Sequence, residues 1–304
     1  MLEASLERLR AAHAQMKTEL QRVIVGQDEV LDQLLLALLT RGHCLLVGVP
    51  GLAKTLMISS LARTLELSFN RIQFTPDLMP SDITGTELLH IDPETSERSF
   101  RFAPGPLFTN VLLADEINRT PPKTQAALPE AQLDRFMFMV KVGYPSAEEE
   151  REILRRTTGG RSAELGPVLR AEELFEMQAA VREIPVADAV YDFVLALTRG
   201  TRVRSGAALD FAQEWITWGA GPRASQCLVL GAKARAVLQG RDHVAAEDVR
   251  AVAHPVLRHR IIPNFTAQAE GIDSDAIIDR LLTEIAPGDG VAAGLPGVSE
   301  SARG

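Results

Sequence analysis

The sequence contains little cysteine and no cluster of metal-binding side chains. Its two cysteines, Cys44 and Cys227, lie far apart among apolar neighbours. We therefore expect buried, reduced thiols rather than a disulfide. The six histidines are scattered, without an HExxH pattern or a Cys/His cluster, so histidine and cysteine supply no predicted metal site.

Long apolar runs and an excess of basic charge are also missing. No run approaches the roughly 18 apolar residues needed to cross a bilayer, and residues 1–23 carry charges throughout. We therefore expect a cytoplasmic protein without membrane insertion. With 32 Lys and Arg against 40 Asp and Glu, the net charge is −8. This balance disfavours a broad nucleic-acid surface, although a local basic groove inside an oligomer would not change the total visibly.

The composition is that of a globular protein with one large domain or two smaller ones. Of the 304 residues, 46% are hydrophobic and 24% are charged. Strand-like and helix-like patterns alternate up to Tyr144, whereas only helical patterns follow it. We expect a nucleotide-binding core over residues 1–144, a helical lid domain over 145–285 and a flexible tail over 286–304.

The hydrophobic pattern of the first part predicts short buried strands between helices. Glycines and acidic residues mark the strand ends, as in parallel sheets. The predicted helices cover residues 2–22, the run from Asp28 to the Arg41-Gly42 stop signal, and 54–65. The predicted strands cover residues 43–47, 69–74, 110–116 and 136–144, with a small hairpin around 92–99.

The strongest motif is LLVGVPGLAKT, residues 45–55. Gly48 and Gly51 let backbone N–H groups converge on phosphate oxygens, and the following helix presents its positive N-terminal end. Lys54 would reach the β- and γ-phosphates, and the Thr55 hydroxyl would hold Mg²⁺. The strict pattern has glycine before the lysine, where this chain has Ala53.

A second motif, VLLADE, ends in the acidic pair Asp115 and Glu116. Ligands of open α/β sheets bind outside the carboxyl ends of the strands, so these carboxylates are expected at the same edge as the phosphate loop. There Asp115 can assist Mg²⁺ binding, and Glu116 can polarise the water that attacks the γ-phosphate. Acidic residues after a strand also serve solubility, so this pair alone is weak evidence for a nucleotide site. The phosphate-loop motif upstream of it favours the role in Mg·ATP binding.

Together these and further stretches resemble one protein family. The stretches are GVPGLAKT, RIQFTPDLMPSDITGTELL, FRFAPGPLF, LADEINRTPPKTQAAL, PEAQLDRF, GYPSAEEEREIL and GPRAS, followed by AKARAVLQGRD and VLRHRI. In this order they resemble the MoxR family of AAA+ ATPases over nearly the whole chain. The resemblance implies an α/β fold, an αβα P-loop core with a helical lid. It also implies ATP and Mg²⁺ as cofactors, a usually hexameric ring and chaperone-like remodelling with von Willebrand factor A domain partners.

The resemblance also assigns roles to individual residues. Glu116 would act in hydrolysis, Arg135 in LDRF matches the arginine finger that reaches a neighbour's γ-phosphate, and Arg223 in GPRAS matches sensor 2. Pro222 suits the first helical position, which places Arg223 in the first turn. The remaining nucleotide residues are Val25, Gly26, Gln27, Gly48, Val49, Pro50, Gly51, Leu52, Ala53, Lys54, Thr55, Leu56 and Asp115, of which Thr55 and Asp115 would hold Mg²⁺.

One departure from the family occurs at the Leu128-Pro129 bond. On the order of 40 residues of family sequence are absent there, about the size of a helix end, a loop and a strand. The missing strand would be the fourth in the family order 5-1-4-3-2, and it would carry sensor 1. Its loss leaves buried backbone groups of two neighbours without partners. We expect the strands to close up in the order 5-1-3-2, or the region to be strained.

Three functions are consistent with these features. The leading one is an ATP-hydrolysing AAA+ remodelling ATPase. The second is a nucleotide-binding relative that is hydrolytically impaired, because no residue matches sensor 1. The third, a DNA-remodelling factor such as a helicase loader, is disfavoured by the acidic balance and the lack of clustered Lys and Arg outside the nucleotide motifs.

Overall fold

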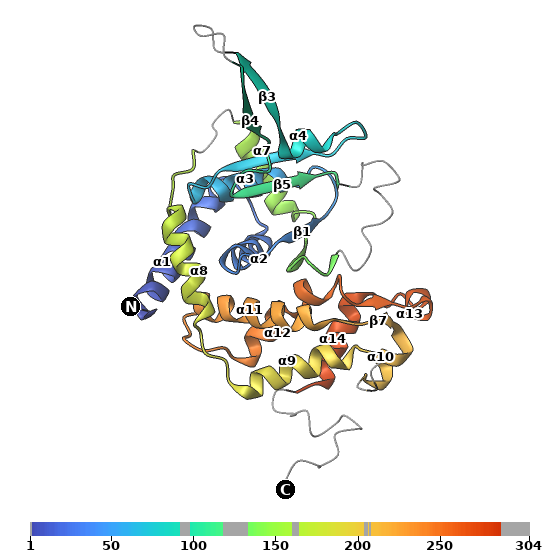
Figure 1. Cartoon of the computed structure of the whole chain (residues 1–304). Coiled ribbons are helices and arrows are strands. Elements are labelled where there is room, and N and C mark those ends of the chain that lie inside the picture. The colour runs from blue at the N-terminus through green and yellow to red at the C-terminus, as the bar shows by residue number, and fades with distance from the viewer. Residues whose placement is uncertain are drawn as a thin grey trace.

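Strands and helices alternate in the first half of the chain, as the hydrophobic pattern predicts (Figure 1). The computed structural model describes residues 2–91, 98–117, 133–159, 164–203, 206 and 208–286. Its helices here are α1 (Leu2–Gln21), α2 (Asp28–Leu39), α3 (Lys54–Thr64) and the short α4 (Pro80–Thr84). Its parallel strands are β1 (Cys44–Val47), β2 (Phe69–Gln73), β5 (Val111–Asp115) and β6 (Phe138–Lys141).

Of the expected strand order 5-1-3-2, the pairs 5-1 and 3-2 are present as β6–β1 and β5–β2, but the four described strands form two separate pairs and not one sheet. Strand β1 pairs with β6, and β2 pairs with β5, but among the described residues no ladder joins β1 to β5. Helix α3, which links β1 to β2, contacts β5 and buries Met57 and Leu61 in the core. The β2–β5 pair is therefore connected to the core through the packing of α3 and not, among the described strands, through a ladder to β1.

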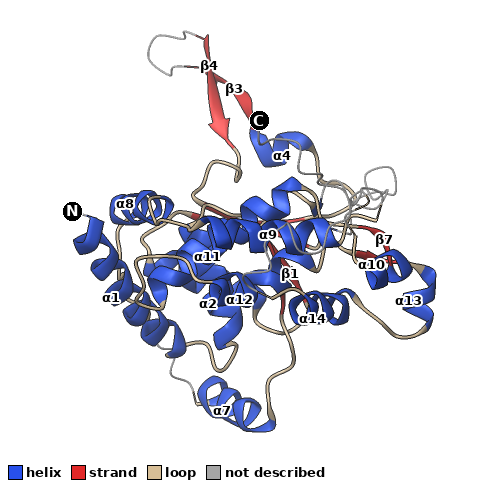
Figure 2. Ribbon diagram, turned by 90° about the horizontal axis from the view of Figure 1, so that it is seen from below, coloured by secondary structure: helices blue, strands red, loops and turns tan. Residues whose placement is uncertain are grey.

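A long β-hairpin projects from the body of the molecule (Figures 1 and 2). It consists of β3 (Gly85–Ile91) and β4 (Arg98–Pro104), paired antiparallel from Gly85↔Pro104 to Ile91↔Arg98. The predicted hairpin is therefore confirmed, and it extends further than the sequence pattern indicated. Residues 92–97, which follow β3 and precede β4 in the sequence, lie outside the described residues.

The second half is mainly helical, as predicted, and contains one short strand pair that the sequence did not predict. Strands β7 (Ile216–Trp218) and β8 (Ile262–Pro263) are too short to produce an alternating pattern. The helices are α7 (Ala147–Thr158), α8 (Ala171–Arg182), α9 (Asp188–Gly200), α10 (Asp210–Trp215), α11 (Pro222–Leu238), α12 (Ala246–Leu257), α13 (Phe265–Ala269) and α14 (Ser274–Glu284).

The two halves share one hydrophobic core. Helix α1 runs beside α8 and also contacts α3 and α11 (Figure 1), so it touches elements of both halves. The ring of Phe138 in β6 is fully buried and faces Gly231 of α11, where an added Cβ would meet Phe138 Cζ at 3.2 Å. The domain boundaries at residues 144 and 285 stay predictions. The Leu128-Pro129 bond and tail residues 287–304 lie outside the described residues.

Two expectations from composition can be compared with the structure. Cys44 and Cys227 are both free thiols; Cys227 is buried and Cys44 is partly buried. Within the described residues, no helix has the length and apolar character required for a membrane span.

The Phe138 contact predicts a large loss of stability on truncation. Phe138→Ala should lower the free energy of unfolding by about 3–5 kcal/mol, because it removes a fully buried ring and leaves a cavity between β6 and α11. Denaturant unfolding measures this change. The matched control is Phe265→Ala, since Phe265 is 85% exposed, and a similar loss in both variants would contradict the packing described.

A buried histidine lies where the helical half meets β6. His259 is 6% exposed, and its Nε2–H donates to the carbonyl of Phe136 at 3.0 Å. Burial lowers the pKa of His259 to about 4, and the charge of Arg260 beside it acts in the same direction. The native state therefore binds fewer protons than the unfolded chain between pH 4 and pH 6.5, and the native state loses stability as the pH falls through this range.

Stability should accordingly depend on pH through His259. As the pH falls from 6.5 to 4, the parent should lose more stability than His259→Gln, by an amount on the order of 3 kcal/mol at the acid end. The glutamine amide can still donate to the Phe136 carbonyl but does not titrate. Denaturant unfolding at several pH values tests this, with His243→Gln as a surface control. Parallel pH profiles for the parent and His259→Gln would refute the assignment.

Candidate functional site

The phosphate loop connects β1 to α3 with the backbone conformation that the motif predicts. Gly51 has φ 88° with open space at its Cβ position, a left-handed conformation that favours glycine. Gly48 is required for another reason, because an added Cβ would lie 2.5 Å from the carbonyl oxygen of Val142. Ala53, which replaces the glycine of the strict pattern, is left-handed too, with φ 53° and ψ 24°.

Helix α3 begins at Lys54 without a side-chain cap. The first backbone N–H groups of a helix have no intrahelical partner, so this end can accept an anion. The ammonium of Lys54 donates to carbonyl oxygens of its own loop, to Gly48 at 2.5 Å and Val49 at 3.3 Å. The lysine is thus folded back over the concave side of the loop, where phosphate oxygens would replace the carbonyls.

The other predicted loop residues form its rim. Val49 and Leu56 are 38% and 43% exposed, and Pro50 is exposed as well. Leu52 packs against the core, and Thr55 lies half-buried in the first turn of α3. The loop is therefore anchored by Leu52 and open on its outer side.

The acidic pair lies at the carboxyl end of β5, held by side chains of the neighbouring strand β2. Asp115 Oδ2 accepts hydrogen bonds from Arg71 Nη2 at 2.6 Å and Nε at 3.1 Å. Glu116 Oε2 accepts one from Gln73 Nε2 at 3.0 Å, and its backbone is left-handed with φ 53°. Because α3 contacts β5, the helix that starts at Lys54 packs against the strand that ends at Asp115.

Val25, Gly26 and Gln27 form the turn between α1 and α2. Gly26 and Gln27 are left-handed, with φ 66° and 59°, and Gln27 Nε2 donates to the Gly143 carbonyl at 2.9 Å. A Cβ at Gly26 would lie 2.1 Å from Glu149 Oε1 in α7. The turn therefore packs against the segment that follows β6.

One of the two predicted arginines, Arg223, contacts an acid that sequence reasoning missed. Arg223 lies in the first turn of α11, which begins at Pro222 as predicted, and its Nη1 lies 3.4 Å from Asp134 Oδ2. Asp134 directly precedes the exposed Arg135. Its other oxygen accepts a hydrogen bond from Arg260 Nε at 2.9 Å. Nothing in the sequence pattern distinguishes Asp134 or Arg260, because their contact spans 126 residues.

The donor set fits a magnesium–nucleotide complex. Mg²⁺ is usually bound by one or two protein oxygens together with phosphate and water, which matches a Thr55 hydroxyl and the Asp115 carboxylate. The described residues contain no group of three or more His, Cys, Asp or Glu side chains that could hold a metal by themselves. The left-handed loop and the uncapped end of α3 fit phosphate.

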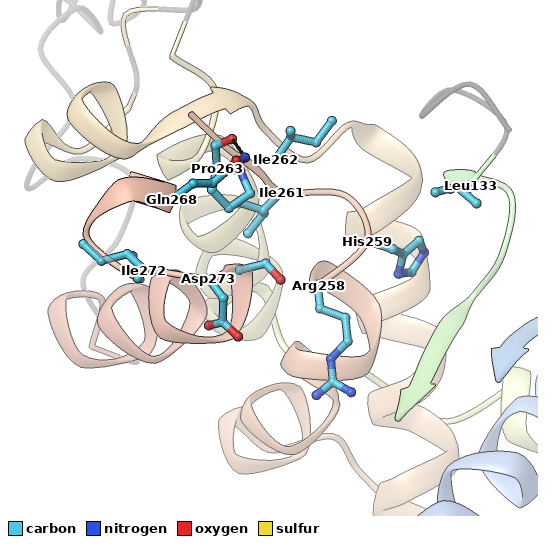
Figure 3. A pocket seen from close by; sticks show the side chains of 11 residues that line it. Leu133, Arg258, His259, Ile261, Ile262, Pro263, Gln268, Ile272 and Asp273 are labelled. Carbon is cyan, nitrogen blue, oxygen red and sulfur yellow. Dashed lines mark hydrogen bonds between the residues drawn. The ribbon is translucent and has the colours of Figure 1, made fainter. Parts of the chain in front are cut away.

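A separate cavity borders the segment before β6 (Figure 3). Leu133 lines it from that segment, and the residues that line it from the helical half are Arg258, His259, Ile261, Ile262, Pro263, Gln268, Gly271, Ile272, Asp273 and Ser274. None of the phosphate-loop residues contributes to its wall. The cavity is therefore distinct from the nucleotide motifs, which lie on an open surface.

Two family models and several known proteins match this chain. The model of the ATPase family associated with various cellular activities (AAA) matches residues 43–131, and an AAA lid domain model matches residues 210–281. The chain is 37% identical to Chaperone MoxR1 of Mycobacterium tuberculosis over 307 residues, covering 88% of this chain and 80% of that protein. It is 28% identical to Protein MoxR of Paracoccus denitrificans, covering 93% and 98%.

A solved structure from Cytophaga hutchinsonii is also similar. It superposes with a TM-score of 0.84 at 33% identity, over 93% of this chain and 97% of that one. Its agreement extends over both halves of the fold. With such relatives matched over most of their length, the chain belongs to the MoxR family of AAA+ ATPases.

Proposed function

We propose that this protein binds Mg·ATP and hydrolyses it to remodel or mature partner proteins. The observation that carries the proposal is the loop from Gly48 to Thr55, left-handed at Gly51 and Ala53, which delivers Lys54 to the uncapped start of α3. A strand followed by a glycine turn and a lysine at the start of a helix is typical of sites that bind a phosphate chain. The relative named a chaperone supports the remodelling part.

The residues have distinct tasks in this proposal. Lys54 would exchange the Gly48 carbonyl for phosphate oxygens, and Thr55 and Asp115 would hold a magnesium ion, which would supply positive charge beside the phosphate chain. To hold this ion, the Asp115 carboxylate must either bind the ion and Arg71 together or give up its hydrogen bond from Arg71. Glu116 orients and polarises the attacking water, with Gln73 fixing its carboxylate.

Assembly completes the proposed site. Arg135 is exposed, as a residue that reaches into a neighbouring subunit must be, and Arg223 would contact the nucleotide of its own subunit. We therefore propose a ring, hexameric by family resemblance, which acts in the cytoplasm. A von Willebrand factor A domain partner stays a prediction from the family.

Lys54→Ala should abolish Mg·ATP binding, because it removes the ammonium that meets the β- and γ-phosphates. Isothermal titration calorimetry measures the affinity directly. Lys17→Ala is the control, since Lys17 pairs with Asp32 on the surface between α1 and α2. Equal ATP affinities of the parent and Lys54→Ala would rule out the assignment of the loop.

A second candidate function is nucleotide binding with impaired hydrolysis. It is favoured by the separation of the β1–β6 pair from the β2–β5 pair, since this places the phosphate loop and the acidic pair on different sheets. The alignment with Chaperone MoxR1 is 307 residues long, but it includes only 88% of the 304 residues of this chain. Part of the alignment therefore consists of residues of that relative that have no counterpart here. This is consistent with the loss of a sensor 1 strand.

Steady-state phosphate release distinguishes the two candidates. If the chain hydrolyses ATP, Glu116→Gln should lower the rate by about 100-fold or more, the typical contribution of a positioned general base. Binding of Mg·ATP should remain in that variant. A parent rate no higher than that of Glu116→Gln, with ATP still bound by both, would establish the impaired relative instead.

A further inference from the structure

The carboxylate of Asp134 lies between two arginines of the helical half. Arg260 Nε donates to Oδ1 at 2.9 Å, and Arg223 Nη1 lies 3.4 Å from Oδ2. The next residue along the chain is Arg135. Asp134 therefore contacts Arg223, which we propose to bind the subunit's own nucleotide. It also directly precedes Arg135, which we propose to bind the nucleotide of the neighbouring subunit.

The contact with Arg260 is a fixed anchor. The side chain of Arg260 is 1% exposed, and its guanidinium also donates to the carbonyls of Asp134 at 2.8 Å, Phe136 at 2.6 Å and Met137 at 3.2 Å. A buried guanidinium with this many acceptors cannot leave them without exposing an uncompensated charge to the interior. Arg260 therefore keeps the carbonyls of Asp134, Phe136 and Met137 in place in any nucleotide state, but none of these contacts is to Arg135 or to Asp134 Oδ2.

The contact with Arg223 is the exchangeable one. Its side chain is 51% exposed, and the 3.4 Å distance is longer than a strong ion-pair hydrogen bond. A nucleotide phosphate carries more charge than one carboxylate and accepts from arginine in the same bidentate way. Phosphate would thus compete successfully with Asp134 for Arg223.

We propose that Asp134 is a positioning residue that couples the two nucleotide sites on either side of a subunit. Without nucleotide it holds Arg223; when Arg223 turns to a bound phosphate, the segment carrying Arg135 loses one of its two side-chain anchors. Whether the subunit's own site holds nucleotide thereby determines how freely Arg135 can move toward the site of the neighbouring subunit. This inference rests on the proposed function, since it takes both arginines as nucleotide ligands.

The first experiment is a binding cycle measured by calorimetry with Mg·ATP. Asp134→Asn should tighten ATP binding about two- to fivefold, the range expected from removing a half-exposed competing ion pair. The asparagine oxygen still accepts from Arg260, and the carbonyl contacts of Arg260 do not involve this side chain. In an Arg223→Ala background, Asp134→Asn should give no further gain.

The matched control is Asp275→Asn. Asp275 also bridges the two halves, since it contacts Lys141 at the end of β6 and Arg258 Nε at 3.1 Å, but it touches neither predicted arginine. Its variant should bind ATP like the parent. An affinity of Asp134→Asn equal to that of the parent, or a gain that persists without Arg223, overturns the coupling while the proposed function stands. A parent that binds no ATP overturns both.

A second readout does not depend on the folding of the Asp134 variant. Hydrogen exchange of the amides of Asp134 and Arg135, which precede the residues hydrogen-bonded to β1, should speed up when the parent binds Mg·ATP, because Arg223 then releases Asp134. In Arg223→Ala, measured at saturating nucleotide, ATP should not change the exchange rate of the same amides. Exchange that responds to ATP equally in both proteins, or in neither, contradicts the proposal.

Discussion

The buried guanidinium of Arg260 is the interaction on which the junction between the two halves depends. It donates to the carbonyls of Asp134, Phe136 and Met137, so it fixes the chain that leads into β6. Strand β6 in turn supplies the ladder for β1, and β1 leads into the phosphate loop. Arg260 and the packing of Phe138 on Gly231 therefore connect the strand beside the phosphate loop to the helical half.

The split between the two strand pairs has a functional meaning. The phosphate loop follows β1, whereas Asp115 and Glu116 end β5, and no described ladder fixes the distance between these strands. That distance is set by side-chain packing of α3, whose Met57 and Leu61 are buried. Apolar packing is less directional than a hydrogen-bond ladder. The proposed hydrolysis thus depends on the less directional of the two kinds of constraint, whereas the proposed nucleotide binding depends on the local structure of the loop.

The parts of the site that could be predicted from the sequence are those determined locally. Gly51, Lys54 and the start of α11 at Pro222 follow from residue types within a few positions, and the structure has them as expected. The hydrogen bond from Arg71 to Asp115 spans 44 residues, and that from Arg260 to Asp134 spans 126. No periodicity or motif contains such pairs, because tertiary packing alone brings them together.

Ala53 illustrates how a one-methyl departure from a motif changes the loop. Holding a left-handed φ of 53° costs alanine about 1–2 kcal/mol more than glycine. The extra methyl group therefore biases the free loop away from this conformation, which glycine would adopt readily. The residue itself does not hold the loop in its observed shape, so the packing around it must do so. The departure from the strict pattern thus makes the shape of the loop depend on the fold that surrounds it.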